Sequence, residues 1–172
     1  MAGSLLIQRV RRLWIGLFKK LQSMSQGSSP RLSAGVQPDE LLSSFVVLPE
    51  QIDKKTNTIK PSRLIPRRNP TNRRLETSVC RSSRLTEAQV WGICSAHFDV
   101  HSRKPAIGRG VGPAKAIFAE ELTFDANGKP YPEHANIIDW HDDIAKPDSE
   151  LKHFWMDRAR QMAKKFSYMP RR

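Results

Sequence analysis

The chain has 172 residues and a formal net charge of +12, from 29 lysine and arginine residues against 17 aspartate and glutamate residues. This length predicts one domain with tails, and a body of about 130 residues can bury a core without disulfides or a structural metal. Cys80 and Cys94 form no CxxC pair and no ladder with histidines, which excludes a disulfide scaffold and a zinc finger and favours a cytoplasmic location.

The charge is unevenly distributed along the chain. Residues 54–84 hold ten basic groups against Glu76 alone, whereas residues 120–150 hold nine acidic groups and two basic ones. Two interpretations are open. The basic stretch faces a polyanion such as nucleic acid, or it packs beside the acidic stretch so that the two fields partly cancel.

Residues 4–22 are predicted to form an amphipathic helix, with apolar side chains on one arc and arginine and lysine on the other. Charges interrupt this segment every few residues, so it is not a transmembrane span. It fits a helix in weak contact with a membrane surface, a transit peptide, or an extension upstream of a true start at Met24. The Ser/Gly/Pro-rich residues 25–38 are predicted to be a disordered linker, so that 1–38 is separate from one domain over 39–172.

Two strands and a helix are predicted in the first half of the body. The apolar and β-branched residues of 41–48 and 77–81 predict strands, separated by a proline-rich loop with a short extended piece at 63–65. A helix is expected to begin at Thr86, because Gln89 completes a capping box, and to run to residue 98.

The second half is predicted to begin with a flexible loop over 102–113 and to end in a long helix. Residues 114–124 are apolar and β-compatible, an Asn-Gly turn follows, and 136–140 predicts a buried strand. The helix expected over 149–166 has an apolar stripe of Leu151, Trp155, Ala159, Met162 and Phe166. The fold class is therefore α+β, a small and mainly antiparallel sheet covered by two helices, plus the separate N-terminal amphipathic helix.

Several short motifs are candidates for chemistry. The glycine-rich run 108–112 lacks the spacing of a nucleotide-binding loop and favours a flexible connection. His97 fits a core histidine better than half of a metal pair with His101, and the pair His141-Asp142 fits an acidic turn. We expect no metal and no cofactor.

His134 and Asn136 are the polar pair with most weight. Residues two apart on a strand point to the same side, so an imidazole and an amide would share one face. Such a pair can bind phosphate or pass a proton, although the alternative, that both tie down a turn, is favoured.

Residues 41–167 resemble a family of short, uncharacterised bacterial proteins. The resemblance lies in Lys60-Pro61-Ser62, Thr77-Ser78-Val79-Cys80-Arg81, Leu85-Thr86-Glu87, Gly108-Arg109-Gly110, and His134-Ala135-Asn136-Ile137 with Trp140. Cys80 stands where an aromatic residue is expected, and His141 where a proline is expected. The resemblance implies a bacterial cytoplasmic domain with matching polar positions at Arg81, Arg109, His134 and Asn136, and it implies no activity.

Three functions are compatible with these features. The first is a binding module for a phosphate-bearing ligand, nucleic acid or nucleotide, and the second is a small enzyme that uses His134 with Arg81 and Arg109 on an anionic substrate. The third is a subunit that only binds another protein. The expected ligand-contacting residues, besides a catalytic His134, are Arg63, Arg67, Arg68, Arg81, Arg109 and Asn136.

Overall fold

The computed structural model describes residues 35–100, 102, 104–143 and 146–172. The predicted helix at 4–22 therefore lies outside the described residues. The compact unit that contains the described residues spans 33–172 and has an α+β fold, which confirms the predicted class. Val36, which precedes the predicted domain boundary at 39, is buried in the core.

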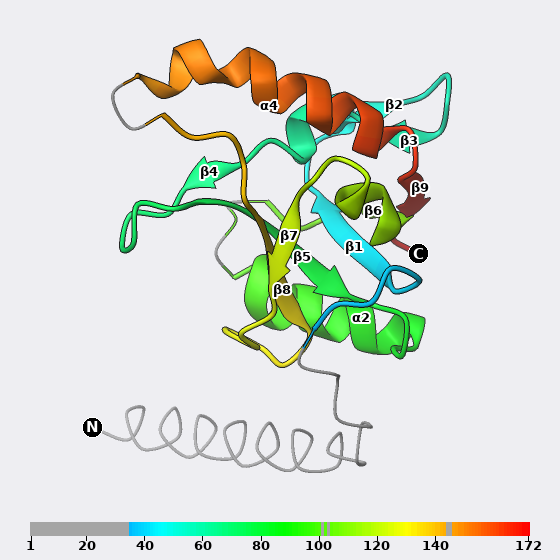
Figure 1. Cartoon of the computed structure of the whole chain (residues 1–172). Coiled ribbons are helices and arrows are strands. Elements are labelled where there is room, and N and C mark those ends of the chain that lie inside the picture. Colours follow the sequence, from blue (N-terminus) through cyan, green and yellow to red (C-terminus); the bar gives the residue numbers. More distant parts are fainter. Residues whose placement is uncertain (1–34, 101, 103, 144–145) are drawn as a thin grey trace, which may run out of the picture. The chain divides into compact units, whose positions relative to one another are not determined.

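The sheet has nine strands and is larger than the sequence indicates (Figure 1). Its order is β2-β3-β9-β6-β1-β5-β8-β7, with β4 beside β5, and every pairing is antiparallel. The strands are β1 (Leu41–Val46), β2 (Ile52–Asp53), β3 (Thr58–Ile59), β4 (Arg67–Arg68), β5 (Leu75–Arg81), β6 (Gly108–Pro113), β7 (Thr123–Asp125), β8 (His134–Ile138) and β9 (Ser167–Pro170).

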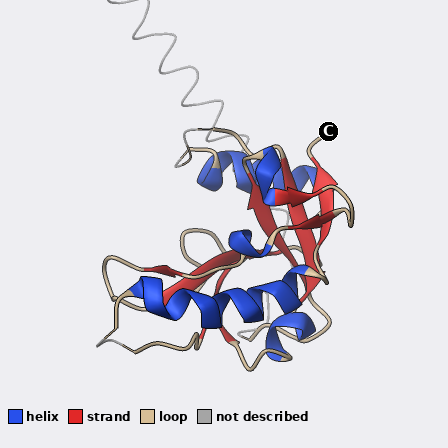
Figure 2. Ribbon diagram, turned by 90° about the horizontal axis from the view of Figure 1, so that it is seen from above, coloured by secondary structure: helices blue, strands red, loops and turns tan. Residues whose placement is uncertain are grey.

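Three α-helices lie within the described residues: α2 (Glu87–Ile93), α3 (Lys115–Phe118) and α4 (Asp148–Ala163). The helix α2 continues into one π-helical stretch, η3 (Cys94–Phe98), and short 3₁₀ turns occur at η1 (Pro49–Gln51) and η2 (Pro61–Arg63). The sheet lies between α4 on one face and α2 on the other, as Figures 1 and 2 show from two directions.

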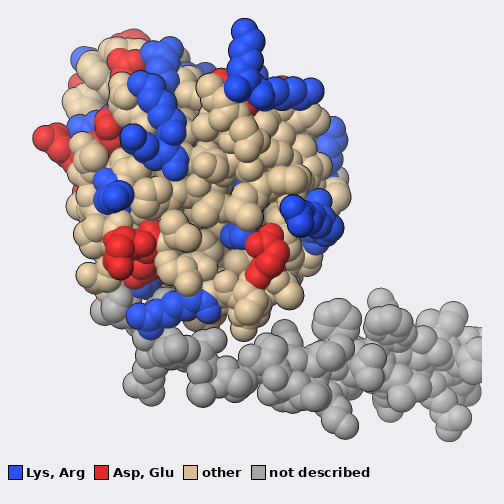
Figure 3. Space-filling view, turned by 90° about the vertical axis from the view of Figure 1, so that its right-hand side faces the viewer, with Lys and Arg blue, Asp and Glu red and all other residues tan. Residues whose placement is uncertain are grey.

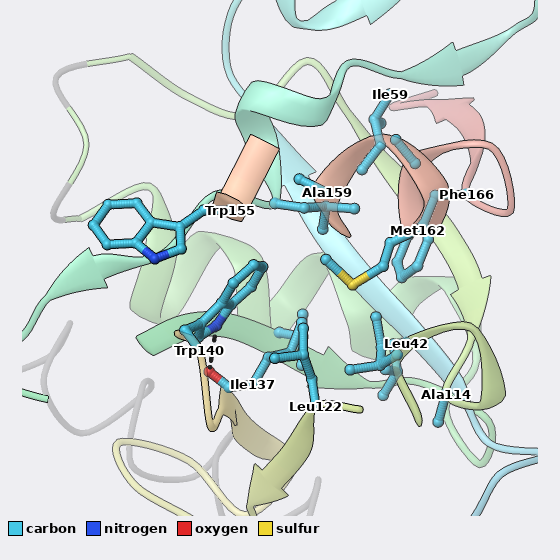
Figure 4. Packing of buried hydrophobic residues seen from close by; sticks show 14 of the residues in the cluster. Leu42, Ile59, Ala114, Leu122, Ile137, Trp140, Trp155, Ala159, Met162 and Phe166 are labelled. Atoms are coloured by element: carbon cyan, nitrogen blue, oxygen red, sulfur yellow. Dashed lines mark hydrogen bonds between the residues drawn. The ribbon is translucent and has the colours of Figure 1, made fainter. Parts of the chain in front are cut away.

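The α4 face carries the main core. Leu151, Trp155, Ala159 and Met162 are buried, and with Phe166 just beyond the helix they form the predicted apolar stripe (Figure 4). They pack on buried side chains of the sheet and its loops, including Leu42, Val79, Ile137 and Leu122. Trp140 lies in the same cluster, and its indole nitrogen donates to the carbonyl of Ile137 at 3.2 Å.

The α2 face carries a smaller cluster. Phe45 and Cys80 of the sheet pack against Val90 and Cys94 of the helix. The predicted capping box is confirmed, because the Thr86 hydroxyl accepts from the Gln89 backbone N–H at 3.3 Å while the Gln89 side chain accepts from the Thr86 N–H at 2.8 Å.

The prediction of a flexible loop for the glycine-rich run 108–112 is wrong. These residues belong to the central strand β6. Gly108, Gly110 and Gly112 alternate along it and face the α4 side, where side chains of Tyr168, Ile59 and Phe166 occupy the space that a Cβ atom would need. A strand whose one face is filled by neighbours needs glycine there, and the period of two was the signal for it.

The interpretation of 114–124 as β-structure is also wrong. Lys115–Phe118 forms the one-turn helix α3, and only Thr123 and Phe124 of that segment join strand β7. The predicted strand at 136–140 begins two residues earlier, at His134, and ends at Ile138. After α4 the chain returns to the sheet as β9, which periodicity did not indicate.

The basic and acidic stretches meet at two places. Arg68 bonds both Asp142 and Asp148 at 2.8–3.2 Å, and Arg74 lies 3.6 Å from Asp125. Figure 3 shows basic and acidic groups interspersed on one face of the molecule. Part of the basic charge is therefore balanced inside the chain. Among the described residues, no helix has the length and apolar composition that crossing a membrane requires.

Candidate functional site

A cleft of about 650 Å³ opens where the ends of β5 and β8 approach η2, β4 and η3. Six of its lining residues are arginine, glutamate or histidine: Arg63, Arg67, Arg68, Glu76, His97 and His134. The aromatic side chains of Tyr131 and Phe98 also line the cleft. Because η3 departs from α-helical geometry where it borders the cleft, it fits the frequent placement of π-helical turns at functional sites.

His134 opens strand β8 and points toward the α2 side. Its strand partner is Cys80 of β5, and paired residues of antiparallel strands share a face. Only 7% of the residue is exposed, and its Nδ1 has no hydrogen-bond partner among the described residues. Burial lowers the pKa of His134 below its usual 6.5, although the nearby carboxylates of Glu76 and Asp125 oppose this. The ring is therefore neutral at pH 7.

Tyr131 lies against two imidazoles. Its ring meets His134 edge-to-face with centroids 5.4 Å apart, and its centroid lies 4.9 Å from that of His97. Burial raises the pKa of the Tyr131 phenol far above its usual value, so the hydroxyl stays protonated. Cys80 lies beside these rings, and burial raises the pKa of its thiol to about 12, which makes it a poor nucleophile at neutral pH.

Arg63 and Arg67 give the cleft its positive charge. The Nε of Arg63 donates to the carbonyl of Phe45, and its guanidinium lies 5.7 Å from the centroid of the Phe98 ring. Burial, together with the neighbouring charge of Arg67, lowers the pKa of Arg63 to about 10. Neither arginine has a carboxylate partner among the described residues.

This lack of a partner separates Arg63 from the other sheltered arginines. Within the part of the chain that the structure describes, five more arginines are buried or half-buried, and each has a carboxylate partner. These are Arg68, Arg81, Arg109, Arg158 and Arg171.

The side chain of Asn136 is committed to a hydrogen-bond network. Its amide nitrogen donates to Glu76 at 3.2 Å, and its oxygen accepts from Ser78 at 3.1 Å. Asn69 and Asn72 also donate to the Glu76 carboxylate, at 2.9 and 3.0 Å. Three amides thus fix the carboxylate at the edge of the cleft, and Asn136 positions it.

Arg81 and Arg109 do not join His134 in the cleft. Arg81 lies opposite Leu42 on the α4 face and bonds Glu40 at 2.7 and 2.8 Å. Arg109 shares the face of His134 but lies three strands away, roughly 14 Å at the usual strand spacing, and bonds Ser43 and Glu87. Arg68 does line the cleft, but Asp142 and Asp148 already neutralise its charge.

The structure thus brings His134 together with Arg63 and Arg67. Sequence reasoning missed Glu76 and Tyr131 and placed His97 only in the core. Tyr131 is three residues before His134, and Glu76 lies two positions from Ser78, the strand partner of Asn136. These proximities follow from strand pairing, which no local pattern revealed. Among the described residues, no group of three or more histidine, cysteine, aspartate or glutamate side chains is placed to hold a metal ion.

Comparisons of the chain with protein-family models, curated proteins and solved structures found no match. The resemblance to a bacterial family therefore stays a prediction.

Proposed function

We propose that the cleft binds a small phosphate-bearing ligand of nucleotide size. The observation that carries the proposal is Arg63, a half-buried cation without a carboxylate partner among the described residues, beside a second unpaired cation, Arg67.

Sheltering a guanidinium from water costs free energy that an ion pair normally offsets. At the other five sheltered arginines a carboxylate does so. At Arg63 the cost is increased by the like charge of Arg67. A bound phosphate would offset this cost at Arg63 and the repulsion between the two cations, because guanidinium groups donate to phosphate oxygens through charge-assisted hydrogen bonds.

The size and lining of the cleft favour a nucleotide over inorganic phosphate. About 650 Å³ falls in the usual range for organic ligands and exceeds what one phosphate fills. Aromatic side chains of Phe98 and Tyr131 offer apolar contact, and His134 offers a buried nitrogen that needs a partner. Arg81 and Arg109 take no part in this proposal, since both are bound elsewhere.

Calorimetric titration of the full chain with the four nucleoside monophosphates, and separately with inorganic phosphate, tests the proposal. We expect at least one nucleotide to bind more tightly than phosphate. Arg63→Gln and Arg67→Gln should each weaken that binding about tenfold or more, the usual effect of losing one charge-assisted hydrogen bond.

Arg84→Gln is the matched control, because Arg84 is exposed, belongs to the same basic stretch and does not line the cleft. It should bind as the unaltered chain does. The proposal fails if no nucleotide binds, or if all three variants lose the same affinity, since the effect would then be one of net charge. Urea unfolding of Arg63→Gln establishes that the variant is folded.

A further inference from the structure

We propose that the cleft is an active site that cleaves ribonucleotide phosphodiesters by attack of the adjacent 2′-hydroxyl, with His134 as general base and His97 as general acid. This inference rests on the proposed function, and it adds a reaction and a substrate class to it.

The first support is the pairing of two imidazoles with two arginines. His97 and His134 both line the cleft and both contact the ring of Tyr131. In this proposal both rings contact one phosphodiester group from their positions against the same side chain. Arg63 and Arg67 would hold the non-bridging oxygens and stabilise the charge that develops on them.

The second support is the difference between the two histidines. His134 is buried and neutral, and its Nδ1 has no partner among the described residues, so it can accept a proton. His97 is half-buried and lies on η3, so its ring remains in contact with solvent. The first suits a base and the second suits an acid.

The step balances without a further reactant. His134 takes the proton of the 2′-hydroxyl, whose oxygen forms a bond to phosphorus. The bond from phosphorus to the 5′-oxygen breaks, and that oxygen takes a proton from the His97 imidazolium. The products are a 2′,3′-cyclic phosphate and a 5′-hydroxyl, and proton exchange with water restores both rings. A nucleophile that belongs to the substrate needs no binding site of its own.

The other side chains of the cleft suit this role. Tyr131 stays protonated and fixes the orientation of both rings. Glu76, held by three amides, lies close enough to favour the imidazolium that forms on His134 when it accepts the proton.

The experiment uses fluorescent oligodeoxynucleotides that each contain a single ribonucleotide, one for each base, incubated with the full chain in excess EDTA. We expect cleavage directly after the ribonucleotide and a cyclic phosphate end in mass spectrometry. An oligonucleotide without ribose should remain intact.

His134→Gln and His97→Gln should each lower the rate at least a hundredfold, in keeping with the usual contribution of one acid or base. His153→Gln is the matched control, because His153 is exposed on α4 and outside the cleft. It should cleave at the unaltered rate. All variants are purified identically, so that a contaminating nuclease would act equally in each.

The outcomes separate the two proposals. Nucleotide binding without cleavage overturns this inference and leaves the proposed function standing. Cleavage that persists in His134→Gln overturns it as well. Failure of both binding and cleavage overturns both proposals. Urea unfolding and nucleotide titration of each histidine variant distinguish a lost proton transfer from a lost fold.

Discussion

Ion pairs of arginine in this protein differ chiefly in how far they are buried. Arg81 is almost fully buried, and its partner Glu40 is 14% exposed. Arg160, in contrast, pairs with Asp157 in the open, with both side chains at least 60% exposed. The same contact geometry therefore has different consequences, since water solvates the exposed pair in both the folded and the unfolded state.

Glu40→Ala should lower the free energy of unfolding by about 3 kcal/mol, because it removes the carboxylate that neutralises the buried Arg81 guanidinium. Asp157→Ala should change it by less than about 1 kcal/mol. Urea unfolding at neutral pH measures both. Equal effects of the two substitutions would contradict the view that burial decides the worth of these ion pairs.

His134 makes stability depend on pH. Its pKa in the folded chain is lowered by burial, so the unfolded chain takes up the proton first as the pH falls. The contribution of His134 to stability is therefore complete above its usual pKa of 6.5 and declines as the pH drops below that value toward the folded pKa.

The free energy of unfolding of the unaltered chain should thus fall relative to that of His134→Gln between about pH 7.5 and about pH 5.5. Urea unfolding across this range measures the difference between the two curves. His153→Gln, which alters an exposed histidine, should run parallel to the unaltered chain. A constant difference for His134→Gln would show that the ring is not held neutral.

At the scale of elements, strand β6 packs closely against its neighbours because its glycines have no side chains on that face. A Cβ on Gly110 would lie 2.6 Å from a carbon of Ile59, which is itself 1% exposed and cannot move aside freely. In α2, by contrast, nothing lies within 4 Å of the Cβ position of Gly92. We therefore expect substitution by a larger residue to be unfavourable at Gly110 and tolerated at Gly92.

Gly110→Ala should lower the free energy of unfolding by about 2 kcal/mol through overpacking. Gly92→Ala should raise it by about 0.8 kcal/mol, because alanine favours the helix more than glycine does. Denaturant unfolding of both variants, compared through their midpoints at equal slope, measures these changes. A stable Gly110→Ala variant would mean that β9 and β3 shift to make room.

Elements with a local chemical cause were predictable, and elements defined by their neighbours were not. The capping box at Thr86 and the apolar stripe of α4 act within a few residues of sequence, and both are confirmed. Strand β6 pairs with β1 and β9, and these strands are distant from it in sequence, so no local pattern predicts the pairing.

The candidate site shows the same limit of prediction. His134 was predicted, whereas its association with Arg63 and Arg67 follows from the packing of η2 and β4 against the sheet.

For the molecule as a whole, the charge of the basic stretch is divided rather than concentrated. Of its ten basic residues, Arg68, Arg74 and Arg81 are paired with carboxylates from other segments. Arg63 and Arg67 line the cleft. This division argues for a ligand held by a few contacts and against a long nucleic-acid footprint.

The salt dependence of RNA binding distinguishes these two modes of recognition. Each phosphate that a protein neutralises on a single strand contributes about −0.7 to the slope of log K against log salt concentration. Binding of a short single-stranded RNA, made uncleavable by 2′-O-methylation at every position, should therefore show a slope of about −0.7 if Arg63 and Arg67 together hold one phosphate. A slope near −6 would mean that most of the basic stretch meets the backbone. Arg67→Gln should bring the slope closer to zero, whereas Arg84→Gln should leave it unchanged. Fluorescence anisotropy at several salt concentrations provides the measurement, and an equal change in both variants would place the contact on the general field of the protein instead of in the cleft.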